Sequence, residues 1–223
     1  MEHFSEPTPI LDQSPTSLSG PWEVPQSPFL LALVSCGGIG ALLFTATYLI
    51  EGITQPGYNA WQQAISALSL GPGGWVQQVN FIVFGLLLIL ASVGWYRLLL
   101  PDRNAVWFPL FQGIGGLGLM SVGVVTSGTL HVLLANALIY AFAIGCFALA
   151  PRFWVARQWR GWMVYSGITG VLILLFWGLF IQGATGNVAG LVERLSAGSH
   201  ALWLCVLTAT VLVQARRRST SAA

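Results

Sequence analysis

Six long apolar segments occupy most of this chain, and short polar stretches separate them. A helix needs about 20 mostly apolar residues to cross the hydrocarbon core of a bilayer. Backbone groups in that core must be hydrogen bonded within their own segment, which an isolated apolar run achieves only as a helix. The sequence therefore predicts an all-α fold, a polytopic membrane bundle with six transmembrane helices over residues 29–50, 76–98, 106–126, 130–150, 161–182 and 195–215.

Composition excludes a soluble protein. Only 7% of the 223 residues are charged and 55% are hydrophobic, whereas about a quarter of the residues of a soluble domain are charged. The formal net charge of +2 gives no reason to expect nucleic acid, because the arginines lie in the short connections that set membrane topology. The partners expected are the lipid bilayer and, for an accessory subunit, other membrane subunits.

The arginines are distributed unevenly about the six spans. The chain contains nine, and no lysine. Arg194 falls on one side of the predicted membrane, and the other side receives Arg97, Arg103, Arg152, Arg157, Arg160, Arg216, Arg217 and Arg218. Arginine is retained in cytoplasmic loops during insertion. We therefore expect a multi-pass protein of the plasma (inner) membrane with both termini in the cytoplasm.

Three parts of the chain differ in composition. Residues 1–27 contain four acidic residues, many Pro and Ser, and no Lys or Arg, which predicts a disordered cytoplasmic tail. No positively charged segment directly precedes the first apolar run, so we expect that run to stay as an anchor rather than be removed as a signal peptide. Residues 28–216 form the predicted transmembrane domain, and 217–223 a second cytoplasmic tail.

Two segments have features beyond hydropathy. In the third span, Gly113, Gly116 and Gly123 share one helical face, and small residues let membrane helices approach closely. We therefore expect this helix at the centre of the bundle. Residues 59–70 have helical composition and are followed by Gly71-Pro72-Gly73-Gly74, a strong stop signal. This segment is too short to span, so it predicts an interfacial or re-entrant helix on the outer side.

Polar residues of the spans and outer loops gather at one level of the predicted membrane. Ionisable groups within a membrane usually face the bundle interior or a watery cavity. We therefore predict an outward-facing pocket lined by Glu51, Tyr58, Asn59, Ser66, Gln77, Asn80, His131, Glu193, Arg194 and His200.

Glu193 and Arg194 are adjacent, so their side chains diverge by about 100° on a helix. The alternative to a pocket role for Arg194 is that it reaches lipid phosphates while Glu193 turns inward. Glu193 shares a helical face with His200 but lies about 10 Å from it along the axis, so Ser196, water or the 59–70 helix would lie between them. A histidine, His131 or His200, is the expected partner of the Glu193 carboxylate.

Three functions fit these residue types. The leading interpretation is a non-catalytic membrane component, either an accessory subunit or a small-ligand or lipid-binding protein. The alternative is an outer-leaflet hydrolase or lipid-modifying enzyme that uses Ser66, His131, Glu193 and His200, types that suit nucleophilic catalysis although no GxSxG motif is present. The second alternative is a haem protein with His131 and His200 as axial ligands. No HxxxH or HExxH pair occurs, so we predict no metal site and no cofactor.

Several short motifs resemble domain-of-unknown-function family 998. They are Tyr58, Ile65-Ser66-Ala67-Leu68 with Gly71, Asn80, Gly85, Gly128-Thr129-Leu130-His131, Gly190 to Arg194, and Trp203. The resemblance covers residues 29–215 and implies a prokaryotic membrane protein of six or seven spans, without an activity. It also implies a second histidine soon after His131, where this chain has Asn136 as its nearest polar residue.

The arginine distribution makes topology testable. A reporter fused after Ala223 should be active in the cytoplasm and inactive on the outer side, because eight of the nine arginines lie on the side of the C-terminus. A reporter inserted into the loop 51–75 should give the opposite pattern. Activity of the C-terminal fusion on the outer side would contradict the predicted orientation.

Overall fold

The computed structural model describes residues 27–100, 106–154, 159–183 and 186–221, and these contain the six predicted spans. The long helices are α1 (Pro28–Thr54), α2 (Trp75–Leu99), α3 (Trp107–Val124), α4 (Gly128–Leu149), α5 (Arg160–Ile181) and α6 (Ala189–Ser221). Each lies in a candidate span long and apolar enough to cross a membrane. The predicted fold is therefore confirmed: the chain is a multi-pass helical membrane protein. The predicted tail at 1–27 lies outside the described residues except for Ser27.

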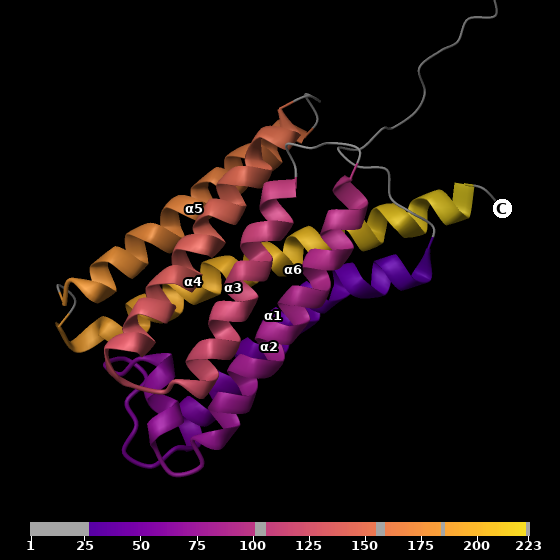
Figure 1. Ribbon diagram of the computed structural model, residues 1–223. Helices are drawn as coiled ribbons and strands as arrows, with labels where there is room; N and C mark the ends of the chain where they lie inside the picture. The colour runs from indigo at the N-terminus through magenta and orange to yellow at the C-terminus, as the bar shows by residue number, and fades with distance from the viewer. Residues whose placement is uncertain (1–26, 101–105, 155–158, 184–185, 222–223) are drawn as a thin grey trace, which may run out of the picture.

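The helices follow one another around a closed ring. Each packs on the next along the chain, and α6 packs back on α1 (Figure 1). The start of α1 and the end of α6 lie at the same end of the bundle, which we call the terminal end. The opposite end carries the loop 55–74 and the α3–α4 and α5–α6 connections, and we call it the loop end. This closed arrangement gives the bundle an interior to which all six helices contribute.

The glycine-rich helix was predicted at the centre of the bundle. The structure instead places it in the ring. Helix α3 packs mainly on α2 and α4. A Cβ added at Gly116 would lie 2.7 Å from the Gly85 backbone oxygen of α2, and one at Gly118 would lie 2.6 Å from the Leu138 Cβ of α4. Glycines on two faces thus bring α3 close to both neighbours, and the centre is left to side chains from every helix.

The terminal half of the interior is filled by aromatic side chains. The ring centroids of Trp95 and Phe108 lie 5.3 Å apart, and those of Phe108 and Trp203 lie 5.6 Å apart, both edge to face. All three side chains are at most 1% exposed. Edge-to-face aromatic pairs add to the packing that area burial provides. In the loop half, Phe44 packs on Phe81 and Phe84 between α1 and α2, and these rings form one wall of the candidate site.

The predicted 59–70 helix is shorter than expected. Only Ile65–Leu70 is helical, as a 3-10 helix (η1), while turns occupy the preceding residues. The backbone oxygens of Ala60, Gln63 and Ala64, which an α-helix would use internally, instead accept hydrogen bonds from side chains of Tyr58 and Arg194. Two further 3-10 turns, η3 (Ala150–Phe153) and η5 (Gly186–Val188), flank α5 and α6.

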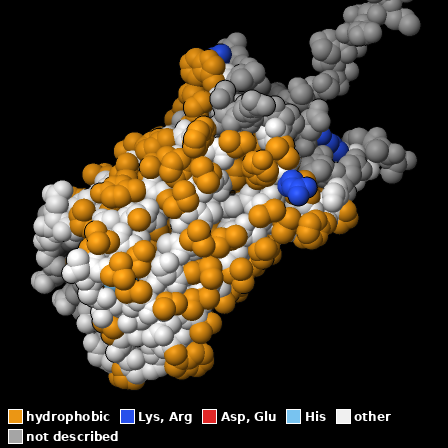
Figure 2. All heavy atoms as spheres, in the orientation of Figure 1, with side chains coloured by type: hydrophobic (Ala, Val, Ile, Leu, Met, Phe, Trp, Pro, Cys, Tyr) orange, Lys and Arg blue, Asp and Glu red, His pale blue; other side chains and the backbone are white. Residues whose placement is uncertain are grey.

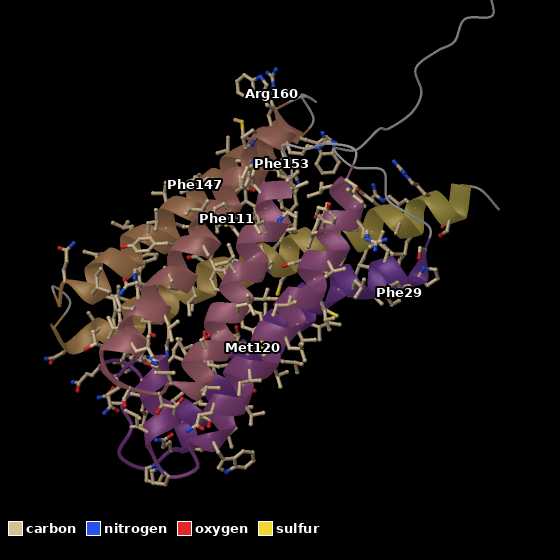
Figure 3. The ribbon with its side chains drawn as sticks, viewed as in Figure 1. Phe29, Phe111, Met120, Phe147, Phe153 and Arg160 are labelled. Carbon is tan, nitrogen blue, oxygen red and sulfur yellow. The ribbon has the colours of Figure 1, made fainter. Side chains whose placement is uncertain are left out.

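The outer surface is that of a membrane protein. Hydrophobic side chains cover much of the face seen in Figure 2, and arginine groups appear toward the terminal end. Arg160 projects from that end, where α5 begins (Figure 3). The described arginines at the terminal end are Arg97, Arg152, Arg160, Arg216, Arg217 and Arg218, and Arg194 lies at the loop end. Arg103 and Arg157 lie outside the described residues.

The close approach of α3 to α2 can be tested with a single methyl group. Gly116→Ala should lower the free energy of unfolding by about 1–3 kcal/mol, because the added Cβ meets a backbone oxygen that cannot move alone. Gly167→Ala on α5 is the matched control, since a Cβ there meets nothing within 4 Å. Unfolding of the detergent-purified variants measures both effects. Equal stability of the two variants would contradict the packing.

Candidate functional site

A cavity of about 200 Å³ lies inside the ring in its loop half. All six long helices and η1 contribute to its lining, which is mostly aromatic and aliphatic. The polar side chains in the lining are Ser66, His131, Glu193 and His200. These four residues are the ones proposed from the sequence as a catalytic set, and the tertiary structure brings all of them to one cavity.

The cavity reaches the outer surface between two helices. Val132, in the second turn of α4, and Ile181, the last residue of α5, both line it. Their side chains are 54% and 48% exposed, respectively. A residue that lines a cavity and is also half exposed marks the cavity's edge. That edge therefore lies near the loop end, where α4 begins and α5 ends, and its exposed residues are apolar.

The polar groups of the cavity lie at two depths. Glu193 is about one turn into α6 and His131 is in the first turn of α4, so both are near the loop end. Ser66 belongs to η1 at the same end. His200 is about three turns into α6, about 10 Å deeper along the helix than Glu193. The cavity thus has a polar part near the loop end and a mainly apolar interior.

The Glu193 carboxylate binds backbone rather than a histidine. Its Oε2 accepts a hydrogen bond from the Ile65 N–H, with 2.6 Å between nitrogen and oxygen. The prediction of His131 or His200 as its hydrogen-bond partner is wrong. The reason is that Ile65 begins η1, and the first N–H groups of a helix have no acceptor within the helix. The prediction that the 59–70 segment lies beside Glu193 is confirmed.

The Arg194 guanidinium binds the same loop; it neither lines the cavity, as predicted, nor reaches for lipid phosphates, the alternative. Its Nη1 donates to the backbone oxygens of Ala60 at 2.8 Å, Gln63 at 3.0 Å and Gly190 at 2.8 Å. Its Nη2 donates to the Tyr58 hydroxyl. We call Glu193 and Arg194, with these loop contacts, the Glu193–Arg194 clamp.

Three further contacts hold the loop on α6. The Leu191 N–H donates to the Trp61 oxygen at 3.1 Å. A Cβ at Gly190 would lie 2.3 Å from the Gln63 oxygen, so only glycine permits this approach. The Tyr58 hydroxyl also hydrogen bonds to the Ala64 oxygen at 2.9 Å. Burial raises the pKa of Tyr58 above its ordinary value, partly opposed by Arg194, so the hydroxyl keeps the proton that it donates.

The two histidines of the cavity have separate partners. His131 Nδ1 lies 2.6 Å from the Val125 oxygen. Because a carbonyl only accepts, Nδ1 carries the proton and, in the neutral ring, Nε2 is an acceptor. His200 Nε2 lies 3.1 Å from Gln112 Oε1, and its ring stacks on Phe142 with centroids 3.9 Å apart.

Gln112 was missed from the sequence. It comes from α3 and is 2% exposed, and its Nε2 has no hydrogen-bond partner among the described residues. The available signal was a single amide within an apolar span, which usually faces the bundle interior. Gln112 was overlooked because it lies toward the terminal end of α3, away from the polar residues at the loop end.

The other predicted pocket residues do not line this cavity. Asn80 donates to the Phe44 oxygen and to Gln77 Oε1, both at 3.1 Å, and so joins α2 to α1. The Asn59 carboxamide oxygen accepts from the Trp61 N–H at 3.0 Å within a turn. Tyr58 and Arg194 belong to the clamp, and Glu51 is near the end of α1. Polar residues at one depth thus belong to the α1–α2 contact, to the Glu193–Arg194 clamp or to the cavity. Depth in the membrane alone does not show which of these a residue joins.

The described side chains of the cavity do not form a metal site. In the described part of the chain, no three His, Cys, Asp or Glu side chains are grouped so that they could hold a metal ion. His131 and His200 line the same cavity, but one nitrogen of each is bonded to Val125 or to Gln112. The haem alternative stays a prediction.

The clamp predicts a local effect of one substitution. Arg194→Gln should speed proteolytic cleavage of the loop 55–64 and lower the free energy of unfolding by about 2 kcal/mol, because hydrogen bonds from a charged donor are lost. Arg160→Gln is the control, since Arg160 is exposed and packs on Trp154 at the terminal end. Cleavage at the same rate in both variants would contradict the clamp.

Comparison with known proteins identifies a family. The family described as "Protein of unknown function (DUF998)" matches residues 38–210. This range includes all of α2 to α5 and every polar residue of the cavity. No curated protein and no solved structure matches the chain.

Proposed function

We propose a function for this chain, which belongs to the DUF998 family of proteins of unknown function: it binds a small amphipathic ligand taken from the bilayer. The cavity carries this proposal, because it combines an apolar interior with polar side chains near the loop end. The protein acts as a non-catalytic membrane component, and the ligand's polar end lies beside Ser66, His131 and Glu193.

The size and lining of the cavity support an apolar ligand. An apolar cavity of about 150 Å³ is large enough to take up benzene, and this one measures about 200 Å³. Phe44, Phe84, Leu119 and Phe142 are among its walls. Burying an apolar chain against such walls is favourable by about 25 cal/mol per Å² removed from water.

The location of the cavity supports entry from the membrane. Its edge lies between the loop ends of α4 and α5, where the apolar side chains of Val132 and Ile181 are exposed. The arginine distribution favours a cytoplasmic terminal end, so the loop end and the cavity belong to the outer leaflet of the plasma membrane. A lipid-like molecule would therefore enter sideways, with its polar end at the outer surface.

Hydrogen bonding favours binding over catalysis. Nucleophilic catalysis needs a nucleophile and a base within hydrogen-bond reach, with a third group orienting the base. Here Glu193 bonds to the Ile65 N–H, His131 to the Val125 oxygen and His200 to Gln112. None of these bonds joins two of the four proposed catalytic residues. Separately held polar groups suit recognition of a ligand's polar end.

A cavity-filling variant tests the proposal. Ala135→Phe should remove co-purifying ligand, because Ala135 lines the cavity and the added ring would occupy it. Ala137→Phe is the matched control, since Ala137 lies two residues away on α4 and is exposed on the outside of the bundle. Native mass spectrometry of the purified variants would show adducts retained by Ala137→Phe and lost by Ala135→Phe. Equal adducts in both would overturn the proposal.

The same preparation separates binding from hydrolysis. The enzymatic alternative is favoured by one observation, that Ser66, His131, Glu193 and His200 share a cavity. A hydrolase would label with a fluorophosphonate probe and lose that label in Ser66→Ala. A binding protein should give no labelling that depends on Ser66. Labelling abolished by Ser66→Ala would replace the binding proposal with the hydrolase.

A further inference from the structure

We infer that the ligand is an apolar chain whose polar end donates hydrogen bonds, an alcohol or a primary amine, and that a chain with an anionic end is rejected. This inference rests on the proposed function and adds the chemical class of the ligand. It follows from which atoms of the polar side chains are already bonded, and which remain for a ligand.

Glu193 has one oxygen left over. Its Oε2 accepts from the Ile65 N–H at 2.6 Å, and within the described residues Oε1 has no hydrogen-bond donor. When the carboxyl group is ionised, its oxygens are acceptors only. Because the residue lines the cavity, the remaining oxygen calls for a donor on the ligand.

His131 adds a second acceptor. Its Nδ1 donates to the Val125 oxygen at 2.6 Å, which leaves Nε2 with a lone pair in the neutral ring. The described residues give this nitrogen no hydrogen-bond partner. Ser66 also lines the cavity, and its hydroxyl can accept or donate. Two of the three polar groups near the loop end therefore demand a donor, and the third tolerates one.

A cation that could neutralise an anionic ligand is missing from the lining. No Arg is among the described residues that line the cavity. The nearest candidate along the chain, Arg194, directs its guanidinium to Ala60, Gln63 and Tyr58. A carboxylate or phosphate would be buried next to Glu193 with no cation among the described lining residues to hydrogen bond to it, and burying an unpaired charge is strongly unfavourable. The arrangement therefore disfavours an anionic ligand as well as favouring one whose polar end donates hydrogen bonds.

The deep part of the cavity is mostly apolar. His200 is the only polar residue there among the described lining residues, and its Nε2 is already bonded to Gln112. Phe142 covers one face of its ring at 3.9 Å. The ligand therefore has its polar end near the loop end and continues inward as hydrocarbon.

Four probes with one chain length test the polar end. They are 1-decanol, decylamine, decanoate and 1-methoxydecane, added at pH 8 to the protein in lipid nanodiscs. Binding is counted as the rise in melting temperature that disappears in Ala135→Phe and persists in Ala137→Phe, which removes partitioning into the lipid. We expect 1-decanol and decylamine to bind at least about tenfold more tightly than decanoate and 1-methoxydecane, a difference of about 1.4 kcal/mol.

Different results would contradict the proposed function and the inference about the ligand's polar end. If none of the probes gives a rise that depends on Ala135, the proposed function itself is wrong. If decanoate or 1-methoxydecane binds as tightly as 1-decanol and decylamine, the cavity binds apolar chains and the inference about the polar end is overturned. Tighter binding of decylamine than of 1-decanol supports the inference with a cationic end, and the reverse supports it with a neutral one.

Substituting the acceptor gives an independent test. Glu193→Gln keeps an oxygen for the Ile65 N–H and turns an amide N–H₂ toward the cavity, so it replaces an acceptor with a donor. The variant should lose the preference for decylamine over decanoate and bind decanoate at least about tenfold better than the unsubstituted protein, again about 1.4 kcal/mol. An unchanged order of the four probes in a folded variant would overturn the inference. If the variant does not fold, the comparison of 1-decanol with 1-methoxydecane decides.

Discussion

Two adjacent residues of α6 hold a stretch of irregular backbone against the helical bundle. Non-helical backbone near a membrane needs partners for its N–H and C=O groups. Arg194 supplies donors to the oxygens of Ala60 and Gln63, and Glu193 supplies an acceptor to the Ile65 N–H. One acid and one base thus satisfy opposite ends of the same peptide segment. The position of η1, and with it the lining of the cavity at the loop end, depends on this pair.

The two halves of the ring differ because different elements fill them. At the terminal half, the large aromatic residues Trp95, Phe108 and Trp203 meet at the centre and leave little space. At the loop half, η1 enters the ring with Ile65 and Leu68 buried. This short element covers the end of the ring without filling it as a long helix would, and a cavity remains beneath.

The clamp also decides the electrostatics of the cavity. A glutamate and an arginine in sequence would suggest a site balanced in charge. Their side chains diverge by about 100° on the helix, and the structure uses that divergence: Arg194 is bonded to the loop while Glu193 lines the cavity. The cavity therefore has the acid without the base, and this separation gives a selective polar end from an ordinary pair of residues.

The sequence by itself determined the six helices, the family and the gathering of polar residues toward one end. Hydropathy is strong evidence in a membrane because lipid permits few backbone structures, and the observed spans agree with the expected ones within a few residues at most ends. The exception is the 59–70 segment, where side chains of Tyr58 and Arg194 take oxygens that a longer helix would need.

Only the tertiary structure decided which polar residues share a cavity and what each one binds. Depth in the membrane can be counted along a helix, but the direction of a side chain toward a neighbouring helix depends on how the ring closes. The sequence therefore grouped Gln77 and Asn80 with Glu193, although Asn80 joins α2 to α1 and Gln77 bonds to Asn80. It passed over Gln112, the partner of His200. The partner of Glu193 is a backbone N–H. Every residue but proline has this group, so the sequence cannot show which backbone N–H will bind a given side chain.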